Sequence, residues 1–179
     1  HKIDKLVDAL AAAHKRGQQV VLVTSGAIAT GLPLLGLEVK PEDLETSQAL
    51  ASVGQGRLIS RYQQSLERYQ IIAAQVLLTS GDLESAETRD NARLAMERMV
   101  SLGVLPIVNE NDTVATHEIK FGDNDRLAAL VAVLVDADAL VLLSDVDALY
   151  DMPPTKEGAK RIHTVKFGED LGGVEIGGS

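Results

Sequence analysis

Residues 104–144 read VLPIVNENDTVATHEIKFGDNDRLAALVAVLVDADALVLLS. The short apolar run at 104–108 is typical of a buried strand, and a second apolar run lies at 139–144. Between them, residues 123–137 are amphipathic and begin with Asp-Asn-Asp, which suits the N-terminus of a helix. Continuous apolar strands separated by helices indicate a parallel sheet covered on both faces. This stretch therefore predicts one strand–helix–strand unit of such a sheet.

The rest of the chain repeats this alternation. Apolar residues recur at helical spacing from Ile3 to Ala11, and the basic residues and glycine that follow them are typical of a helix end. The patterns predict further strands over 18–23 and 71–79, and helices over 47–69 and 88–103, the first of these weakened or bent near Gly54 and Gly56. The expected fold class is α/β: a three-layer αβα sandwich around a mainly parallel sheet.

The composition limits the classes of function. The chain has 179 residues, 45% of them apolar, and its 17 Lys and Arg against 26 Asp and Glu give a formal net charge of −9. That charge argues against nucleic acid as a partner of this domain. The chain has no Cys, which excludes disulfides and thiolate metal sites and fits a reducing cytoplasm. No apolar run reaches the roughly 18 residues of a membrane span. We expect an acidic, cytoplasmic domain without a membrane segment.

We expect residues 1–179 to form one domain that is truncated at both ends. A doubly wound sheet usually begins with a strand, whereas this chain begins directly in a predicted helix. It stops in the glycine-rich run EIGGS at 175–179.

Polar residues follow four of the predicted strands. The endings are VTSGA at 23–27, LLTSGD at 77–82, IVNEND at 107–112 and LLSDVD at 142–147. Ligands bind at the carboxyl ends of strands in open parallel sheets. Any one ending is explained equally well as a helix cap, but four on one edge favour a crevice lined with polar groups.

Individual residues at these strand ends suggest chemistry. Ser25 offers a hydroxyl beside backbone N–H groups that suit an anion. Asp112 and Asn124 together suit a ligand with an amino and a carboxylate group, and the segment 113–122 between them is a candidate flap. Asp125 is a candidate for orienting cationic groups, although acids in a first helical turn also serve simply to complement the helix dipole.

A further pair of polar residues lies at the last predicted strand end. Ser144 and Asp145 are candidates for contact with a nucleotide, or for capping the turn that follows.

Several of these motifs occur together in one known family. VTSGAIATG, ASVGQGRL, PIVNENDTVATHEIKFGDND and VLLSDVDALYD stand in an order and spacing that resemble the glutamate 5-kinase family of the amino acid kinase superfamily. The likeness runs over residues 1–166, and the block VNEND followed by FGDND is its most specific part. Ala148 departs from the family, which usually has Gly at this position.

The resemblance implies ATP-dependent phosphorylation of the side-chain carboxylate of L-glutamate to L-glutamyl 5-phosphate, the first step of proline biosynthesis, with ATP and Mg²⁺ as cofactors. It also implies roles for six residues, with Ser25, Asp112 and Asn124 binding glutamate, Asp125 catalytic through its contact with lysines, and Ser144 and Asp145 at the nucleotide.

The resemblance further implies a homo-oligomer, either a dimer or a tetramer, and feedback inhibition by proline. Two lysine segments of the family, a K-x-G-[ST]-S-like strand end and a GTGGM-x-T-K segment, do not occur among these residues. Two alternatives stay open: a related kinase of the same superfamily that acts on another small acid, and a non-catalytic amino-acid-binding regulatory module.

Overall fold

The computed structural model describes residues 2–115, 123–144 and 147–169. The chain divides into two compact units, His1–Leu140 and Val141–Ser179, and each is described by itself. The prediction that all 179 residues form one domain stays a prediction.

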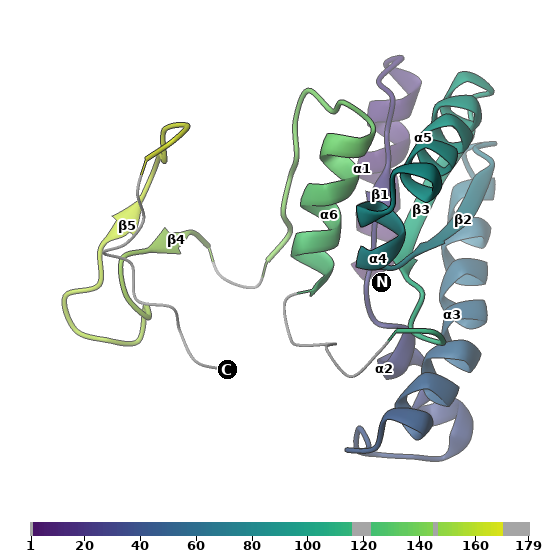
Figure 1. The fold of residues 1–179 in the computed structure, drawn as a ribbon, viewed down its shortest axis with the longest axis horizontal. Helices are drawn as coiled ribbons and strands as arrows, with labels where there is room; N and C mark the ends of the chain where they lie inside the picture. The colour runs from purple at the N-terminus through teal and green to yellow at the C-terminus, as the bar shows by residue number, and fades with distance from the viewer. Residues whose placement is uncertain (1, 116–122, 145–146, 170–179) are drawn as a thin grey trace. The chain divides into compact units, whose positions relative to one another are not determined.

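The first unit alternates helices and strands along the chain (Figure 1). Its elements are α1 (Lys2–Lys15), β1 (Leu22–Val23), α2 (Ala27–Gly31), the 3₁₀ helix η1 (Pro33–Leu35), α3 (Leu44–Glu67), β2 (Ala73–Leu78), α4 (Ser80–Glu84), α5 (Ala86–Ser101), β3 (Leu105–Glu110) and α6 (Asp123–Leu134).

The three strands form a parallel sheet in the order β1-β3-β2. In the register, Ile107 of β3 lies beside Leu22 of β1 and Gln75 of β2. Because side chains alternate along a strand, Ile107 packs into one core cluster and Val108 into another on the opposite face.

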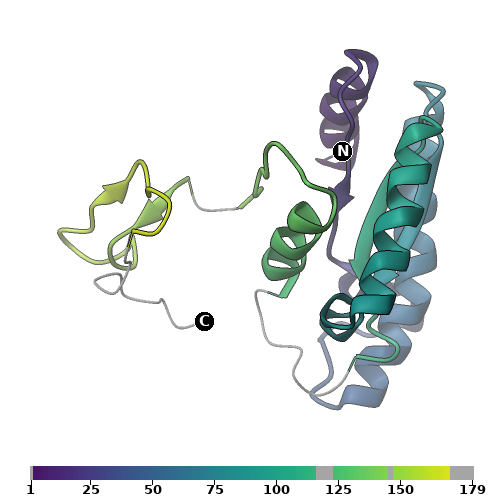
Figure 2. The same cartoon turned by 45° about the horizontal axis from the view of Figure 1, so that its top comes forward.

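Helices cover both faces of this sheet (Figures 1 and 2). On one face, α1 and α3 bury side chains that include Val7 and Leu66, both fully buried. On the other, α5 and α6 bury Met96 and Leu127. The α/β sandwich predicted from the sequence is confirmed, and the burial of both faces explains why the strands read as continuous apolar runs.

Close backbone packing holds α2 against α3. A Cβ atom at Gly54 of α3 would lie 1.8 Å from the carbonyl oxygen of Ala27, and one at Gly31 of α2 would lie 2.1 Å from that of Leu50. Only glycine fits at these two positions. The helix α3 is continuous through Gly54 and Gly56, and the expected weakening near these glycines stays a prediction. The structural reason for Gly54 is the contact with α2.

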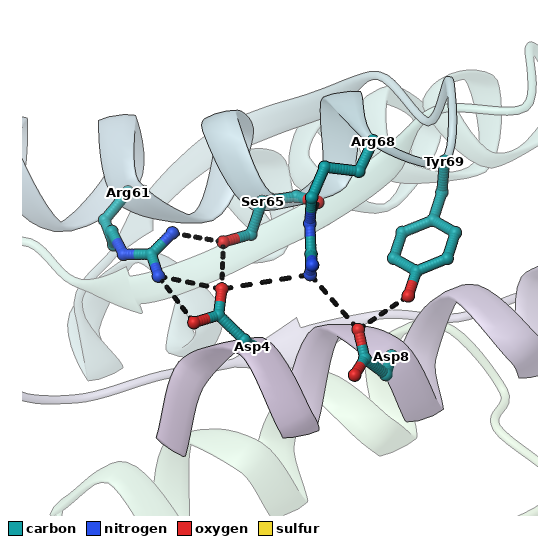
Figure 3. A network of polar contacts seen from close by, with 6 residues as sticks. All are labelled: Asp4, Asp8, Arg61, Ser65, Arg68 and Tyr69. Atoms are coloured by element: carbon teal, nitrogen blue, oxygen red, sulfur yellow. Dashed lines mark hydrogen bonds and ion pairs between the residues drawn. The ribbon is translucent and has the colours of Figure 1, made fainter. Parts of the chain in front are cut away.

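A polar network joins α1 to α3 along the edge of their apolar contact (Figure 3). The Arg61 guanidinium donates to both carboxylate oxygens of Asp4, at 2.7 and 2.8 Å, and the Ser65 hydroxyl donates to Asp4 Oδ1 at 3.0 Å. One turn along α1, Asp8 Oδ1 accepts from Arg68 and from the hydroxyl of Tyr69 at 2.6 Å. The hydrogen bonds from Arg61, first, and from Ser65 lower the pKa of the Asp4 carboxyl.

Two sequence expectations about strands are wrong. The strand expected over 18–23 is formed only at Leu22–Val23, and residues 139–144 form no strand. The apolar side chains at 140–143 are exposed. A strand exists only where a neighbouring strand takes up its backbone N–H and C=O groups, and no described strand pairs with 139–144.

In the second unit, β4 (Leu149–Tyr150) pairs antiparallel with β5 (Arg161–Ile162). None of the described helices is long and apolar enough to cross a membrane.

Candidate functional site

A cavity of about 290 Å³ lies at the carboxyl end of the sheet. The end of β3 and the residues that follow it form one wall, α3 forms a second, and β2 contributes a third. The lining residues are Ala51, Ser52, Gln55, Gly56, Gln75, Leu77, Glu110, Asn111, Asp112 and Thr113. Four of these residues come from the VNEND stretch and the threonine after it, so the apolar strand leads directly into a polar cavity.

A buried amide pair ties the end of β3 to α3. Asn109 is 2% exposed and its Nδ2 donates to Oε1 of Gln55, which is 8% exposed, at 2.6 Å. The backbone N–H of Asn111 donates to the carbonyl of Leu78 on β2, at 3.0 Å. These bonds hold the start of the polar stretch against the elements that form the cavity.

The residues after Asp112 are also held on α3. The hydroxyls of Ser52 and Thr113 are hydrogen bonded at 2.9 Å, and Gln48 Nε2 donates to the carbonyl of Ala115 at 3.1 Å. Residues 113–115 are thus the described part of the segment predicted as a flap. The remainder, 116–122, lies outside the described residues.

Asp112 is the predicted substrate ligand that lines the cavity. Its side chain is partly buried, and burial raises the pKa of its carboxyl above the ordinary value of 3.8. The positive charge of Lys40 acts in the opposite direction. A buried carboxylate gains from a cation placed beside it, so the arrangement favours a ligand with a positively charged group.

Ser25 lies in the loop between β1 and α2, at the same carboxyl edge of the sheet. Its side chain is exposed, and it precedes Gly26, whose φ of 97° requires the left-handed conformation that glycine adopts freely. The neighbouring Thr24 is buried and its hydroxyl is hydrogen bonded to that of Tyr62 at 3.2 Å. The structure places Ser25 at this edge but not in the lining of the cavity.

Asn124 and Asp125 lie in the first turn of α6, which packs against β1 and β3. Asn124 Oδ1 is buried and has no hydrogen-bond partner among the described residues. Asp125 is exposed. An unpaired buried amide oxygen is costly, which makes Asn124 a candidate acceptor for a ligand or for a group beyond the described part of the chain.

Only one of the two residues predicted to contact the nucleotide lies in the described part of the chain. Ser144 is exposed and belongs to the second unit, whereas Asp145 lies outside the described residues. Their roles stay predictions.

Several lining residues were missed in the sequence analysis, above all Gln55 and Gln75. Gln55 had a signal: it precedes the buried Leu58 and Ile59 by three and four residues, so it belongs to the apolar face of its helix. A glutamine on a core face calls for a polar partner. That partner is Asn109, which is 54 residues away and cannot be identified from local sequence.

No group of three or more His, Cys, Asp or Glu side chains suited to a metal ion occurs within residues 2–115, 123–144 and 147–169.

Comparison with known proteins places the chain in a family. Residues 1–178 match the model of the amino acid kinase family. The chain is 67% identical over 176 residues to a glutamate 5-kinase of Clavibacter sepedonicus, covering 98% of this chain and 68% of that protein. It is 66% identical over 176 residues to the enzyme of the same name from Leifsonia xyli, and 54% identical to that of Streptomyces coelicolor. Each alignment covers 98% of this chain, with 65% of the Leifsonia protein and 47% of the Streptomyces protein covered. The chain therefore belongs to the amino acid kinase family.

Proposed function

We propose that the protein containing this chain transfers the γ-phosphoryl group of ATP to the side-chain carboxylate of L-glutamate, which is the first step of proline biosynthesis. The observation that carries the proposal is the polar cavity at the carboxyl edge of the sheet, lined by Asp112 and the residues around it. The proposal is supported by 67% identity over 176 residues to a protein named glutamate 5-kinase.

The chemistry of the cavity fits an amino acid. Asp112 binds the substrate ammonium, because a positive charge offsets the burial of its carboxylate. Ser25 and Asn124 lie at the same edge of the sheet and supply further hydrogen bonds to the substrate. A volume of about 290 Å³ is at the small end of the range for ligand pockets and suits a molecule of the size of glutamate.

Phosphoryl transfer depends mostly on positioning and on electrostatic stabilisation. Asp125, at the start of α6 and exposed to solvent, orients cationic groups toward the reacting phosphoryl group. Ser144 and Asp145 contact the nucleotide. Mg²⁺ is usually held by one or two carboxylates together with substrate phosphates, so a cage made only of protein ligands is not required. When bound, the ion neutralises charge on the phosphates.

We extend the proposal to a cytoplasmic homo-oligomer that proline inhibits, as in the family that the sequence resembles. Size-exclusion chromatography with light scattering measures the assembly, and titration of the reaction with proline measures the inhibition. A monomer would contradict the proposed assembly, and full activity in saturating proline would contradict the proposed inhibition.

Hydroxylamine trapping tests the reaction. The full-length protein is incubated with MgATP, L-glutamate and hydroxylamine, which converts an acyl phosphate into a hydroxamate. We expect ATP-dependent formation of γ-glutamyl hydroxamate, and much less product with L-aspartate, whose side chain is one methylene shorter. A protein that releases ADP without hydroxamate, or that prefers another acid, would refute the proposed substrate.

A further inference from the structure

The charged groups among the described residues that line the cavity are all of one sign. Glu110 and Asp112 are acidic, and no basic side chain is among the described lining residues. An amino acid brings an α-carboxylate as well as an ammonium group. Within this lining, the side chains that can donate hydrogen bonds to a carboxylate are the neutral amides of Gln55, Gln75 and Asn111, together with the hydroxyls of Ser52 and Thr113.

Gln55 is the most constrained of these donors. It is 8% exposed and lies on α3, a helix of 24 residues, whereas Gln75 is exposed on β2 at the edge of the sheet. The bond from Asn109 occupies Gln55 Oε1 and thereby fixes the orientation of the amide. Its Nε2 then presents N–H donors, and none of the hydrogen bonds between described residues uses them.

We propose that Gln55 determines specificity for a free α-carboxylate by donating an N–H group of Nε2 to that carboxylate. The inference rests on the proposed function and names a further substrate-binding residue of the same site. The proposal concerns the α-carboxylate because this group and the ammonium are bonded to the same carbon atom. If the ammonium lies at Asp112, the α-carboxylate lies in the same cavity, while the side-chain carboxylate extends toward the phosphoryl donor.

The substitution Gln55→Glu tests this interaction, with the thermal unfolding of the variant recorded beside its ligand binding. The new carboxylate still accepts the hydrogen bond from Asn109, so the buried pair is kept. The substitution removes the N–H donor and adds an acidic group to Glu110 and Asp112 of the described lining. Loss of a hydrogen bond to a charged group, with added repulsion, is expected to weaken binding of L-glutamate about tenfold or more.

The measurement is equilibrium binding of two ligands to the full-length protein by calorimetry, namely L-glutamate and its α-amide, isoglutamine. The α-amide keeps the ammonium and the side-chain carboxylate but has N–H donors in place of one α-carboxylate oxygen. We expect Gln55→Glu to shift the ratio of the two dissociation constants toward isoglutamine by about tenfold or more. If Gln55 had a merely structural role, the substitution would weaken the binding of both ligands equally.

Gln64→Glu is the matched control, because it makes the same change of charge at an exposed position of the same helix. It should leave both dissociation constants unchanged. Gln55→Met, which removes the donors without adding charge, is the second variant, with its thermal unfolding recorded because Asn109 loses an acceptor. It should weaken L-glutamate more than isoglutamine.

The outcomes separate the inference from the proposed function. The inference is overturned if Gln55→Glu and Gln64→Glu show the same ratio of the two dissociation constants, even if the unchanged protein forms glutamyl hydroxamate. A protein that binds L-glutamate without phosphorylating it overturns the proposed function, and the binding ratio still decides the role of Gln55. A protein that does not bind L-glutamate at all overturns both.

Discussion

The substitution Gly54→Ala places a methyl group where the backbone of α2 now lies. The added Cβ would be 1.8 Å from the carbonyl oxygen of Ala27 and 2.6 Å from the backbone nitrogen of Gly31. Both atoms belong to the main chain, so no rotation of a side chain relieves the clash. To reach an ordinary contact of 3.4 Å, α2 would have to recede by about 1.6 Å from α3.

The size of the effect follows from two opposing terms. Alanine in place of glycine within a helix gains about 1 kcal/mol. Overpacking a core typically costs about 1–3 kcal/mol, and a clash with two main-chain atoms belongs at the upper end of that range. We expect the clash to win, with a net loss of about 2 kcal/mol in the free energy of unfolding and a melting temperature about 4 to 8 °C lower.

Gly56→Ala is the internal control on the same helix. Apart from its chain neighbours and the nearby backbone of α3 itself, no atom of the described residues lies within 4 Å of a Cβ built at Gly56. The propensity term therefore acts alone, and this variant should be more stable than the unchanged protein by about 0.5–1 kcal/mol. Thermal and urea unfolding of both variants in the full-length protein provide the measurement. Equal stability of the two variants would refute the reasoning that close packing of α2 on α3 requires glycine at position 54.

Three further predictions concern single polar groups. Asp112→Asn should raise KM for L-glutamate about tenfold or more, with KM for ATP nearly unchanged. Because burial raises the pKa of Asp112, this variant should also have a higher melting temperature at neutral pH. The gain in melting temperature should vanish below pH 3.8, the ordinary pKa of the carboxyl. Thr79→Ala should lower the free energy of unfolding in urea by about 1 kcal/mol, because it removes a capping box at α4. Ser85→Ala should lower it little, because the Ser85 hydroxyl caps no backbone N–H. Since hydrogen bonds lower the pKa of Asp4, its contribution to stability is complete above pH 3.8, the ordinary pKa, and is lost as the pH falls through the lowered pKa. The melting temperature of Asp4→Asn should therefore fall less steeply with acid than that of the unchanged protein. An equal dependence of the two melting temperatures on pH would contradict this.

Local pattern was enough to predict most of the first unit. The predicted helix over 88–103 corresponds to α5 at Ala86–Ser101, and the predicted strand over 71–79 to β2 at Ala73–Leu78. Both signals are local, since amphipathic periodicity and apolar runs depend only on neighbouring residues. The position of Asp112 directly after a buried strand also followed from sequence, because parallel strands end at one edge of the sheet.

Features that depend on distant partners did not follow from sequence. Residues 139–144 have the composition of a buried strand, yet form none in the described structure because a strand requires a neighbour to take up its backbone groups. Gly54 was interpreted as a weak point of its helix, whereas its role depends on Ala27, which comes before that helix in the chain.

The sequence by itself determined the αβα architecture and the edge of the sheet at which polar groups gather, because periodicity and strand ends are properties of contiguous residues. Only the tertiary structure decided that Gln55 faces this cavity with its amide oriented by Asn109. The two residues are 54 positions apart, and their hydrogen bond exists only once α3 has packed against the sheet.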